Sequence, residues 1–318
     1  MKARADEPFA PDVSITEQAN PQTADIDARS MDEVVALIND EDARVAPAVR
    51  RELGPIAQAA AAIVKSLQKG GRLYYFGAGT SGRLGVLDAS EMPPTYGVPP
   101  DLVQAYIAGG DRALRTAVEG AEDDAQAGAQ AVAEAGVSRC GVTKGGVTKG
   151  DVVVGIAASG TTPWVLAAVA EARQRGAITV GLTCAPGSPL ARAVDIPIVP
   201  VVGPEVISGS SRMKAGTAQK MVLNTLSTAT MIGLGKVYGN LMVDVQPTNA
   251  KLRRRAVRIL QQAAHVDAQT AQRALDETGY EVKTALVMLL AKVDAGEAKA
   301  RLAAADGRVR RAIQGDSI

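Results

Sequence analysis

A glycine-rich turn in the first third of the chain carries the residue types that bind phosphate. An apolar run at residues 73–76 leads into Gly77-Ala-Gly-Thr-Ser-Gly82, and an apolar-periodic segment follows and stops at Pro93-Pro94. Glycines let the backbone come close to an anion, and the first amides of a new helix point toward it. The candidate anion-binding residues in this turn are Gly79, Thr80, Ser81 and Gly82.

The same turn also matches the dinucleotide fingerprint Gly-x-Gly-x-x-Gly. That function requires an acidic residue at the tip of the next strand to hold a ribose. The next apolar run, at residues 102–107, leads into Ala108-Gly109-Gly110 and offers no carboxylate there. The P-loop pattern also fails, because no Gly-Lys-Ser/Thr closes the turn. A tight turn without any ligand stays open on this motif alone.

Two more hydroxyl-rich segments lie at strand-to-helix transitions. Ser159-Gly-Thr-Thr-Pro163 follows an apolar run, and a serine-rich segment at residues 208–217 opens a long helical pattern. Three such turns in one sheet can converge on one small anion, because strand ends of a parallel sheet meet at one edge. The pattern therefore suits a phosphosugar better than a long dinucleotide.

Carboxylates are the remaining candidates for acid–base chemistry. The single histidine, His265, lies in the C-terminal helical region, so no nearby imidazole activates a serine and the hydroxyls are interpreted as binders. Two carboxylates on separate elements can divide acid and base roles if their pKa values differ. For the run from Glu119 to Asp124, spacing alone favours the alternative that these carboxylates form the solvated face of a helix. The candidates are Glu91, Glu119, Glu122, Asp123 and Asp124.

The order of apolar patterns predicts an α/β fold. Strands and helices alternate from residue 72 to 236, which is typical of a doubly wound parallel sheet with helices on both faces. We expect an N-terminal tail and helical arm at 1–62, the α/β domain at 63–236 and a small helical domain at 250–318. Strands are predicted at 73–76, 102–107, 151–157, 177–183 and 196–201, and helices at 31–38, 40–51, 55–67, 81–89, 111–135, 163–175, 211–234, 250–264, 267–276, 281–291, 294–303 and 307–315.

Composition excludes several classes of function. The net charge of +1 gives no general attraction to nucleic acid or to an anionic membrane. The two cysteines lack CxxC spacing, which argues against a disulfide framework or a zinc site. The chain shows neither an apolar leader nor an apolar run of about 18 residues, so we expect a cytoplasmic protein without a metal or a membrane span.

Long blocks of the sequence resemble N-acetylmuramic acid 6-phosphate etherases, bacterial peptidoglycan-recycling enzymes built on the sugar-isomerase (SIS) phosphosugar-binding fold. The resemblance covers nearly the whole chain. Its strongest blocks are Gly209-Ser-Ser-Arg-Met-Lys-Ala-Gly-Thr-Ala-Gln-Lys220 and Gly239-Asn-Leu-Met-Val-Asp244, with further matches at Gly77 to Glu91 and at Ala117 to Asp123.

The resemblance implies a reaction and its residues. It implies cleavage of the D-lactyl ether at C3 of the sugar, giving N-acetylglucosamine 6-phosphate and D-lactate, with water consumed and no cofactor. Glu91 would be the proton donor and Glu122 the base. The phosphate anchor would be Thr80, Ser81, Ser159, Ser210 and Ser211, with the Gly79 and Gly82 amides and with Lys214 as a further cation.

One distance conflicts with a site made by a single chain. A straight helix from Ser81 to Glu91 places the carboxylate about 15 Å from the phosphate end. The phosphate and C3 of one sugar are closer than that. Either the helix breaks near Gly85, or the protein is a homodimer in which Glu91 serves a ligand held mainly by the other subunit; we favour the homodimer.

The chain departs from its relatives at three places, and two other functions stay open. Met92 stands where cysteine is common, Thr161 stands where arginine is frequent, and a tandem Gly-Val-Thr-Lys-Gly lies at residues 141–150. One alternative function is an aldose–ketose phosphate isomerase of the same fold. The other is a phosphosugar sensor without catalysis, similar to the glucokinase regulatory protein.

Overall fold

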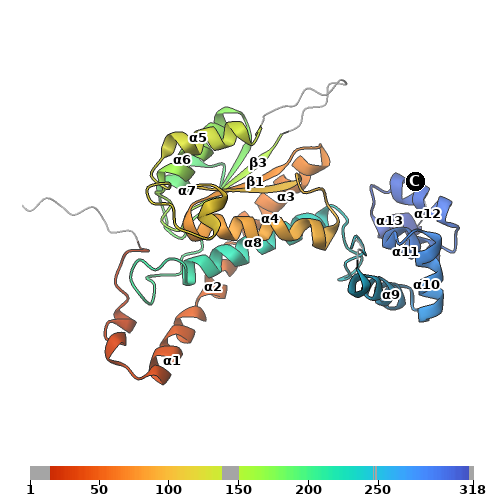
Figure 1. Ribbon diagram of the computed structural model, residues 1–318, viewed down its shortest axis with the longest axis horizontal. Helices are drawn as coiled ribbons and strands as arrows, with labels where there is room; N and C mark the ends of the chain where they lie inside the picture. The colour runs from red at the N-terminus through yellow and green to blue at the C-terminus, as the bar shows by residue number, and fades with distance from the viewer. Residues whose placement is uncertain (1–14, 138–149, 246, 248, 315–318) are drawn as a thin grey trace, which may run out of the picture.

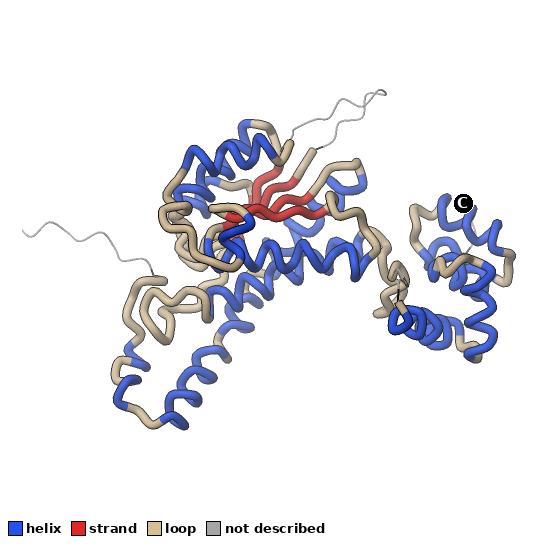
Figure 2. Tube along the Cα trace, viewed as in Figure 1, coloured by secondary structure: helices blue, strands red, loops and turns tan. Residues whose placement is uncertain are grey.

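The centre of the protein is a five-stranded parallel sheet (Figures 1 and 2). The computed structural model describes residues 15–137, 150–245, 247 and 249–314. The strand order β2-β1-β3-β4-β5 places β1 and β3 side by side in the middle of the sheet. The chain leaves β1 toward β2 and leaves β3 toward the opposite edge, so the switch point of the sheet lies between these two strands. The strands are β1 (Leu73–Gly77), β2 (Val103–Ile107), β3 (Val152–Ile156), β4 (Ile178–Leu182) and β5 (Ile196–Ile198).

Helices cover both faces of the sheet, which confirms the predicted doubly wound fold. Along β1, Leu73 and Tyr75 face one apolar core, and Tyr74 and Phe76 face the other, because successive strand residues point to opposite faces. The first core is completed by α2 (Val45–Arg50), α3 (Leu53–Gln68), α4 (Gly79–Tyr96) and α8 (Lys214–Gly233), and the second by α5 (Ala125–Glu134), α6 (Pro163–Gln174) and α7 (Pro189–Ala193).

An N-terminal arm precedes the sheet. It contains the 3-10 turns η1 (Pro21–Thr23) and η2 (Ile26–Ala28) and the helix α1 (Met31–Asp42), which projects from the body in Figure 1. Ser30 and Glu33 form the capping box at the start of α1. The predicted boundary near residue 39 is wrong: α1 continues to Asp42 and α2 begins at Val45. Pro47 explains the break, since in one continuous helix it would leave a carbonyl without a donor.

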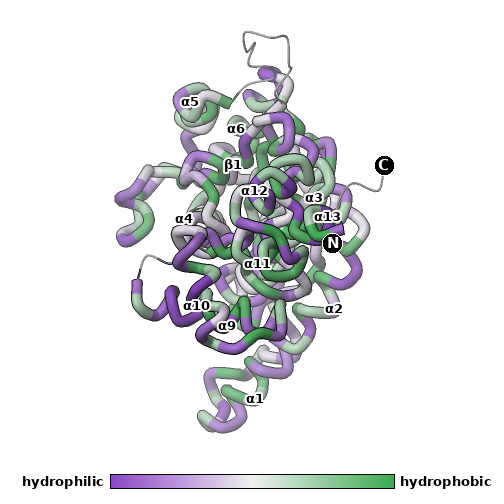
Figure 3. The backbone as a smooth tube through the Cα atoms, turned by 90° about the vertical axis from the view of Figure 1, so that its right-hand side faces the viewer, coloured by the Kyte–Doolittle hydropathy of each residue, from purple (hydrophilic) through white to green (hydrophobic). Residues whose placement is uncertain are grey.

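The C-terminal helices form a core of their own. Their buried residues lie between Val243 and Ala312, and α11 (Val282–Ala291) contacts the other four helices. Figure 3 shows hydrophilic residues along α9 and α10, whereas α11 is predominantly hydrophobic. The other helices are α9 (Ala250–Ala264), α10 (Ala268–Glu277), α12 (Ala295–Ala304) and α13 (Val309–Gln314). None of the helices described is long and apolar enough to cross a membrane.

Two predicted helices differ from the structure. The predicted helix at 111–135 is a short 3-10 turn η3 (Asp111–Leu114), a run of turns and then α5. Gly120 has φ of 72° and Asp124 caps α5, so the acidic run at 119–124 is not a helix face. The predicted helix at 81–89 continues to Tyr96 through both prolines. Burial of Met92 and Tyr96 in the core holds this last turn.

Other boundaries agree within a few residues, with exceptions near β5. That strand ends at Ile198 rather than at 201, in an edge position that tolerates Pro197. The short helix α7, capped by Ser188, is absent from the prediction. The N-terminal tail to residue 14, Cys140 and most of the tandem repeat lie outside the described residues.

Candidate functional site

A polar cavity of about 360 Å³ lies at the switch point of the sheet. Segments from three hydroxyl-rich turns meet in its wall, one after β1, one after β3 and one before α8. Within the described chain its lining contains no lysine or arginine. The donors that it offers to an anion are therefore hydroxyls and the amides at the start of α4. The lining includes Gly79, Thr80, Ser81, Glu122, Ser159 and Ser211.

The three glycines of the first turn have different roles. Side chains at Gly77 and Gly82 would collide with the backbone of the turn itself, and one at Gly82 would lie 2.5 Å from Ile107 of β2. These two glycines allow the turn to pack tightly. Gly79 has φ of 54°, and a Cβ built there meets no atom within 4 Å. Gly79 faces the cavity, whereas Gly82 is not part of its lining.

The second turn is held by internal hydrogen bonds. The hydroxyls of Ser159 and Thr161 lie 2.9 Å apart, and the Thr161 amide donates to Ser159 Oγ at 3.3 Å. A side chain at Gly160 would overlap Ser188, so this turn packs directly on the loop after β4. Both hydroxyls line the cavity.

The third turn places Ser211, but not Ser210, in the cavity wall. The Gly216 amide donates to the Ser211 carbonyl at 2.9 Å, which ties the turn to the first residues of α8. The N-terminal segment also reaches this turn, since the Gly209 amide donates to the Thr16 carbonyl at 3.2 Å. Thr16 and Glu17 consequently line the cavity, which the sequence analysis did not predict.

Lys214 lies away from the cavity, in a buried ion pair. It is 1% exposed and its ammonium contacts the carboxylate of Glu41, which is 2% exposed. Burial raises the pKa of Glu41, but hydrogen bonds from Lys214 and Asn20 outweigh it and lower that pKa overall. Glu205 accepts the Lys214 amide at 3.0 Å. These contacts join the arm to the start of α8, and Lys214 does not line the cavity.

Glu122 reaches the cavity from the run of turns between η3 and α5. Its carbonyl accepts the Trp164 amide of α6 at 3.0 Å, and its exposed side chain also borders a smaller cavity of about 230 Å³. Arg83 of α4 donates to the carbonyls of Ala113 and Leu114, at 2.7 and 3.2 Å. No local sequence pattern marks this arginine, because its partners are backbone atoms of a distant turn.

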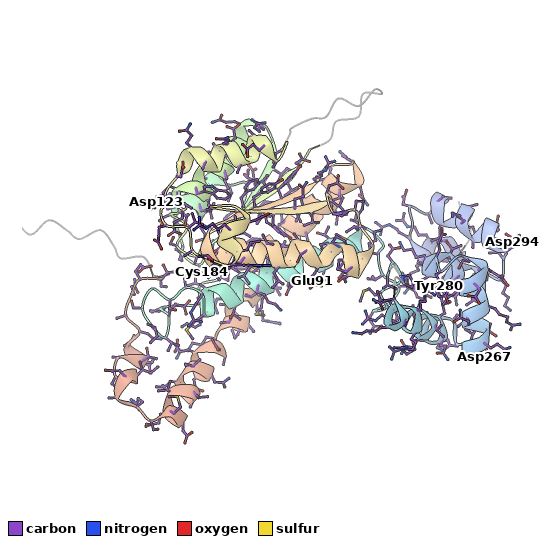
Figure 4. The ribbon with its side chains drawn as sticks, viewed as in Figure 1. Glu91, Asp123, Cys184, Asp267, Tyr280 and Asp294 are labelled. Carbon is purple, nitrogen blue, oxygen red and sulfur yellow. The ribbon has the colours of Figure 1, made fainter. Side chains whose placement is uncertain are left out.

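Glu91 lies outside this cavity, at the far end of α4. The helix runs without a break past Gly85, which excludes the first of the two explanations for the long distance. Gly85 instead lets α4 pack closely on β1, since a Cβ there would lie 3.1 Å from that of Tyr75. Figure 4 shows Glu91 well apart from Asp123, on the part of α4 nearer the C-terminal helices. Its side chain is exposed.

A second buried carboxylate braces α4 against α8. Asp88 accepts hydrogen bonds from Tyr75 at 3.0 Å, from Asn224 at 2.8 Å and from Ser227 at 2.9 Å. Burial raises the pKa of Asp88 above its ordinary value, although these three donors oppose the shift. Because every partner is internal, the role of this cluster is to fix the helix that carries Glu91.

Comparison with known proteins gives matches along nearly the whole chain. Residues 55–173 match the N-terminal SIS domain of the glucokinase regulatory protein, residues 120–229 match the SIS domain, and residues 239–285 match the C-terminal lid domain of the glucokinase regulatory protein.

Relatives of similar length share about half of the sequence. The N-acetylmuramic acid 6-phosphate etherase of Aeromonas hydrophila is 53% identical over 293 residues, which is 92% of this chain and 95% of that protein. The enzyme of the same name from Symbiobacterium thermophilum is 56% identical over 88% of this chain and 89% of its own. A solved structure of a phosphoheptose isomerase from Francisella tularensis is 23% identical, with a TM-score of 0.44, over 64% of this chain and 98% of its own.

Proposed function

This chain belongs to the N-acetylmuramic acid 6-phosphate etherase family, and we propose that it cleaves the D-lactyl ether of N-acetylmuramic acid 6-phosphate. The products are N-acetylglucosamine 6-phosphate and D-lactate, which makes the protein a carbon–oxygen lyase of peptidoglycan recycling in the cytoplasm. The observation that carries this proposal is one cavity that combines three hydroxyl turns with the Glu122 carboxylate.

The sugar phosphate binds at the switch point. Its phosphate accepts hydrogen bonds from Thr80, Ser81, Ser159 and Ser211 and from the Gly79 amide, all of which line the cavity. Neutral donors at helix starts stabilise a phosphate dianion without a paired cation. Ser210 and Gly82 contribute by holding the backbone of their turns, and Lys214 by anchoring α8 to the arm.

Glu122 acts as the base. In the ring-opened sugar, the C1 aldehyde acidifies the C2 proton, and Glu122 removes it before the C3–O bond breaks. An acid then protonates the departing lactate oxygen. Water adds to C3 of the unsaturated aldehyde and restores the proton at C2. Glu122 and its neighbour Asp123 both line the cavity next to the phosphate turns, and we assign the base to Glu122, as the resemblance to the family implies.

Glu91 acts as the acid from the second subunit of a homodimer. The uninterrupted helix α4 separates this carboxylate from the phosphate turns of its own chain by about 15 Å. Leu87, one turn before it, is 50% exposed, and Met31 and Val35 of the arm are also exposed. We infer that a partner chain covers these side chains and that the partner's Glu91 reaches the cavity.

The deciding experiment uses deuterated water. Supplied with N-acetylmuramic acid 6-phosphate, the protein should release D-lactate and leave deuterium at C2 of the sugar product. Glu122→Gln should abolish exchange at C2, and Glu91→Gln should spare exchange more than lactate release. Glu119→Gln, in the same run of turns but outside the main cavity, serves as the control. Lactate without exchange would overturn the elimination mechanism.

The same assay separates the two other functions. An isomerase would convert a sugar phosphate to its ketose, which NMR of the products detects. A sensor related to the glucokinase regulatory protein, whose domains match this chain, would bind N-acetylglucosamine 6-phosphate and leave the etherase substrate intact. Intact substrate would therefore overturn the proposed activity.

A further inference from the structure

A buried amide stands directly behind one hydroxyl of the cavity. Gln219, on α8, is 1% exposed, and its Oε1 lies 3.0 Å from the hydroxyl oxygen of Ser81. Its amide nitrogen is buried and has no hydrogen-bond partner among the described residues. An unpaired buried N–H is costly, so this glutamine calls for an explanation.

The orientation of the amide decides what Ser81 can offer to a ligand. If the oxygen of Gln219 faces Ser81, the hydroxyl proton is used inside the protein. If the nitrogen faces it, the amide donates to the lone pair of Ser81 Oγ, and the hydroxyl proton becomes free to point into the cavity. The two ends of a glutamine amide have nearly the same shape, so the hydrogen-bond network selects between them.

We propose that Gln219 is a positioning residue of the phosphate site, which donates from Nε2 to Ser81 Oγ so that Ser81 donates its proton to the phosphate. This inference rests on the proposed function and names one residue beyond it. In this arrangement one N–H of the amide gains an acceptor, while Oε1 gives up its hydrogen bond from Ser81, and an unpaired carbonyl is tolerated better than an unpaired N–H. The hydroxyl of Ser81 also becomes a stronger donor, because hydrogen bonds in a chain polarise one another.

The packing around Gln219 suits this role. Ala215, Ala218 and Val222 on the same helix are fully buried, so the helix cannot shift without disturbing the core. A Cβ at Gly216 would lie 3.4 Å from the Thr80 methyl, which shows how closely α8 approaches the first turn. The amide is therefore held in place before a ligand arrives, and little freedom is lost on binding.

Calorimetry with N-acetylglucosamine 6-phosphate and with N-acetylglucosamine tests the proposal on the full chain. Gln219→Met keeps the volume but cannot donate, and it should weaken binding of the phosphorylated sugar about tenfold. Gln219→Glu accepts the Ser81 proton and adds negative charge, so it should weaken binding further. Asn224→Leu, which removes a hydrogen bond to Asp88 from the same helix, is the structural control and should retain affinity.

A double-mutant cycle tests whether Gln219 affects phosphate binding through the hydroxyl of Ser81. If Gln219 acts through this hydroxyl, Gln219→Met should add no further loss in a Ser81→Ala background. Additive losses, or unchanged affinity of Gln219→Met, would overturn the inference while leaving the phosphate site in place. Equal affinity of the unaltered protein for the two sugars would instead overturn the phosphate site itself, and the inference with it.

Discussion

Single residues in this protein have roles that depend on partners far away in the chain. Lys214 stands next to the serines of the third turn in sequence, yet its ammonium contacts a carboxylate 173 positions away. Glu41 also accepts a hydrogen bond from Asn20 at 2.9 Å. The segment around Asn20, α1 and α8 are thereby joined at one buried point.

Removing one partner of this ion pair should destabilise the protein more than replacing both partners with apolar residues. Lys214→Met leaves the Glu41 carboxylate buried without its main partner and should cost about 3–5 kcal/mol of unfolding free energy. The double variant Lys214→Met, Glu41→Leu should recover most of that loss. Urea denaturation measures both values, and equal stability of the single and double variants would contradict the expectation.

The same pair predicts a dependence of stability on pH. The pKa of Glu41 is lower in the folded protein than its ordinary value of 4.5. A lowered carboxyl pKa contributes stability that is present above the unfolded-state value and is lost as the pH falls through the folded-state value. The stability gap between the wild type and Glu41→Gln should therefore be constant above about pH 5.5 and should shrink below about pH 4.5. Unfolding curves from pH 3 to 7 test this; a gap that widens in acid would refute it.

At the scale of elements, the run of turns between β2 and α5 decides where Glu122 points. Three contacts hold this run in place. The Arg83 side chain donates to the carbonyls of Ala113 and Leu114, and the Trp164 amide donates to the Glu122 carbonyl. Gly109 packs against Val118 and Ala121. The sequence pattern alone resembled one long helix, since alanines are abundant there.

Two adjacent glycines offer a matched test of this element. Gly109 and Gly110 have φ of 82° and 66°, and Gly110 has ψ of −163°, a region used almost only by glycine, so alanine should strain the backbone at either position by about 1–3 kcal/mol. Only at Gly109 would the new Cβ meet Val118, at 2.9 Å. Gly109→Ala should therefore lower kcat about tenfold or more by moving Glu122, whereas Gly110→Ala should change mainly Tm. Similar kcat values for the two variants would contradict this.

At the scale of the whole molecule, the arm, the α/β body and the C-terminal helices are distinct parts (Figure 1). Asp244, near the junction, lies 3.0 Å from the Lys236 ammonium and 2.6 Å from that of Lys283. These ion pairs connect the end of the body to α11. Glu91 lies on the part of α4 nearer these helices, away from the phosphate turns.

Mixing two inactive variants tests the shared site. In a dimer of Glu91→Gln with Glu122→Gln, one of the two sites combines an intact Glu122 with an intact Glu91 from the other chain. Random exchange of subunits should therefore restore about a quarter of wild-type lactate release. Each variant alone, after the same treatment, is the control. Recovery of no activity in confirmed mixed dimers would place both glutamates in one chain.

Local sequence patterns were enough to predict the α/β fold, the parallel sheet and the hydroxyl turns at its edge. These follow from local patterns, since apolar periodicity and glycine positions are readable within about ten residues. The same patterns predicted each C-terminal helix within about two residues at most boundaries, because Asn249, Asp267 and Asp294 cap helices as expected from their residue types.

Which of these residues face one another depends on the tertiary structure. It extended α4 through two prolines, because the buried side chains of Met92 and Tyr96 outweigh the lost helix hydrogen bonds. Contacts between segments more than 100 residues apart bury Lys214 outside the cavity and place Gln219 behind Ser81. Such pairings depend on long-range packing, which no local pattern records. The glycine turn and its hydroxyls were therefore readable from sequence, and their partners were not.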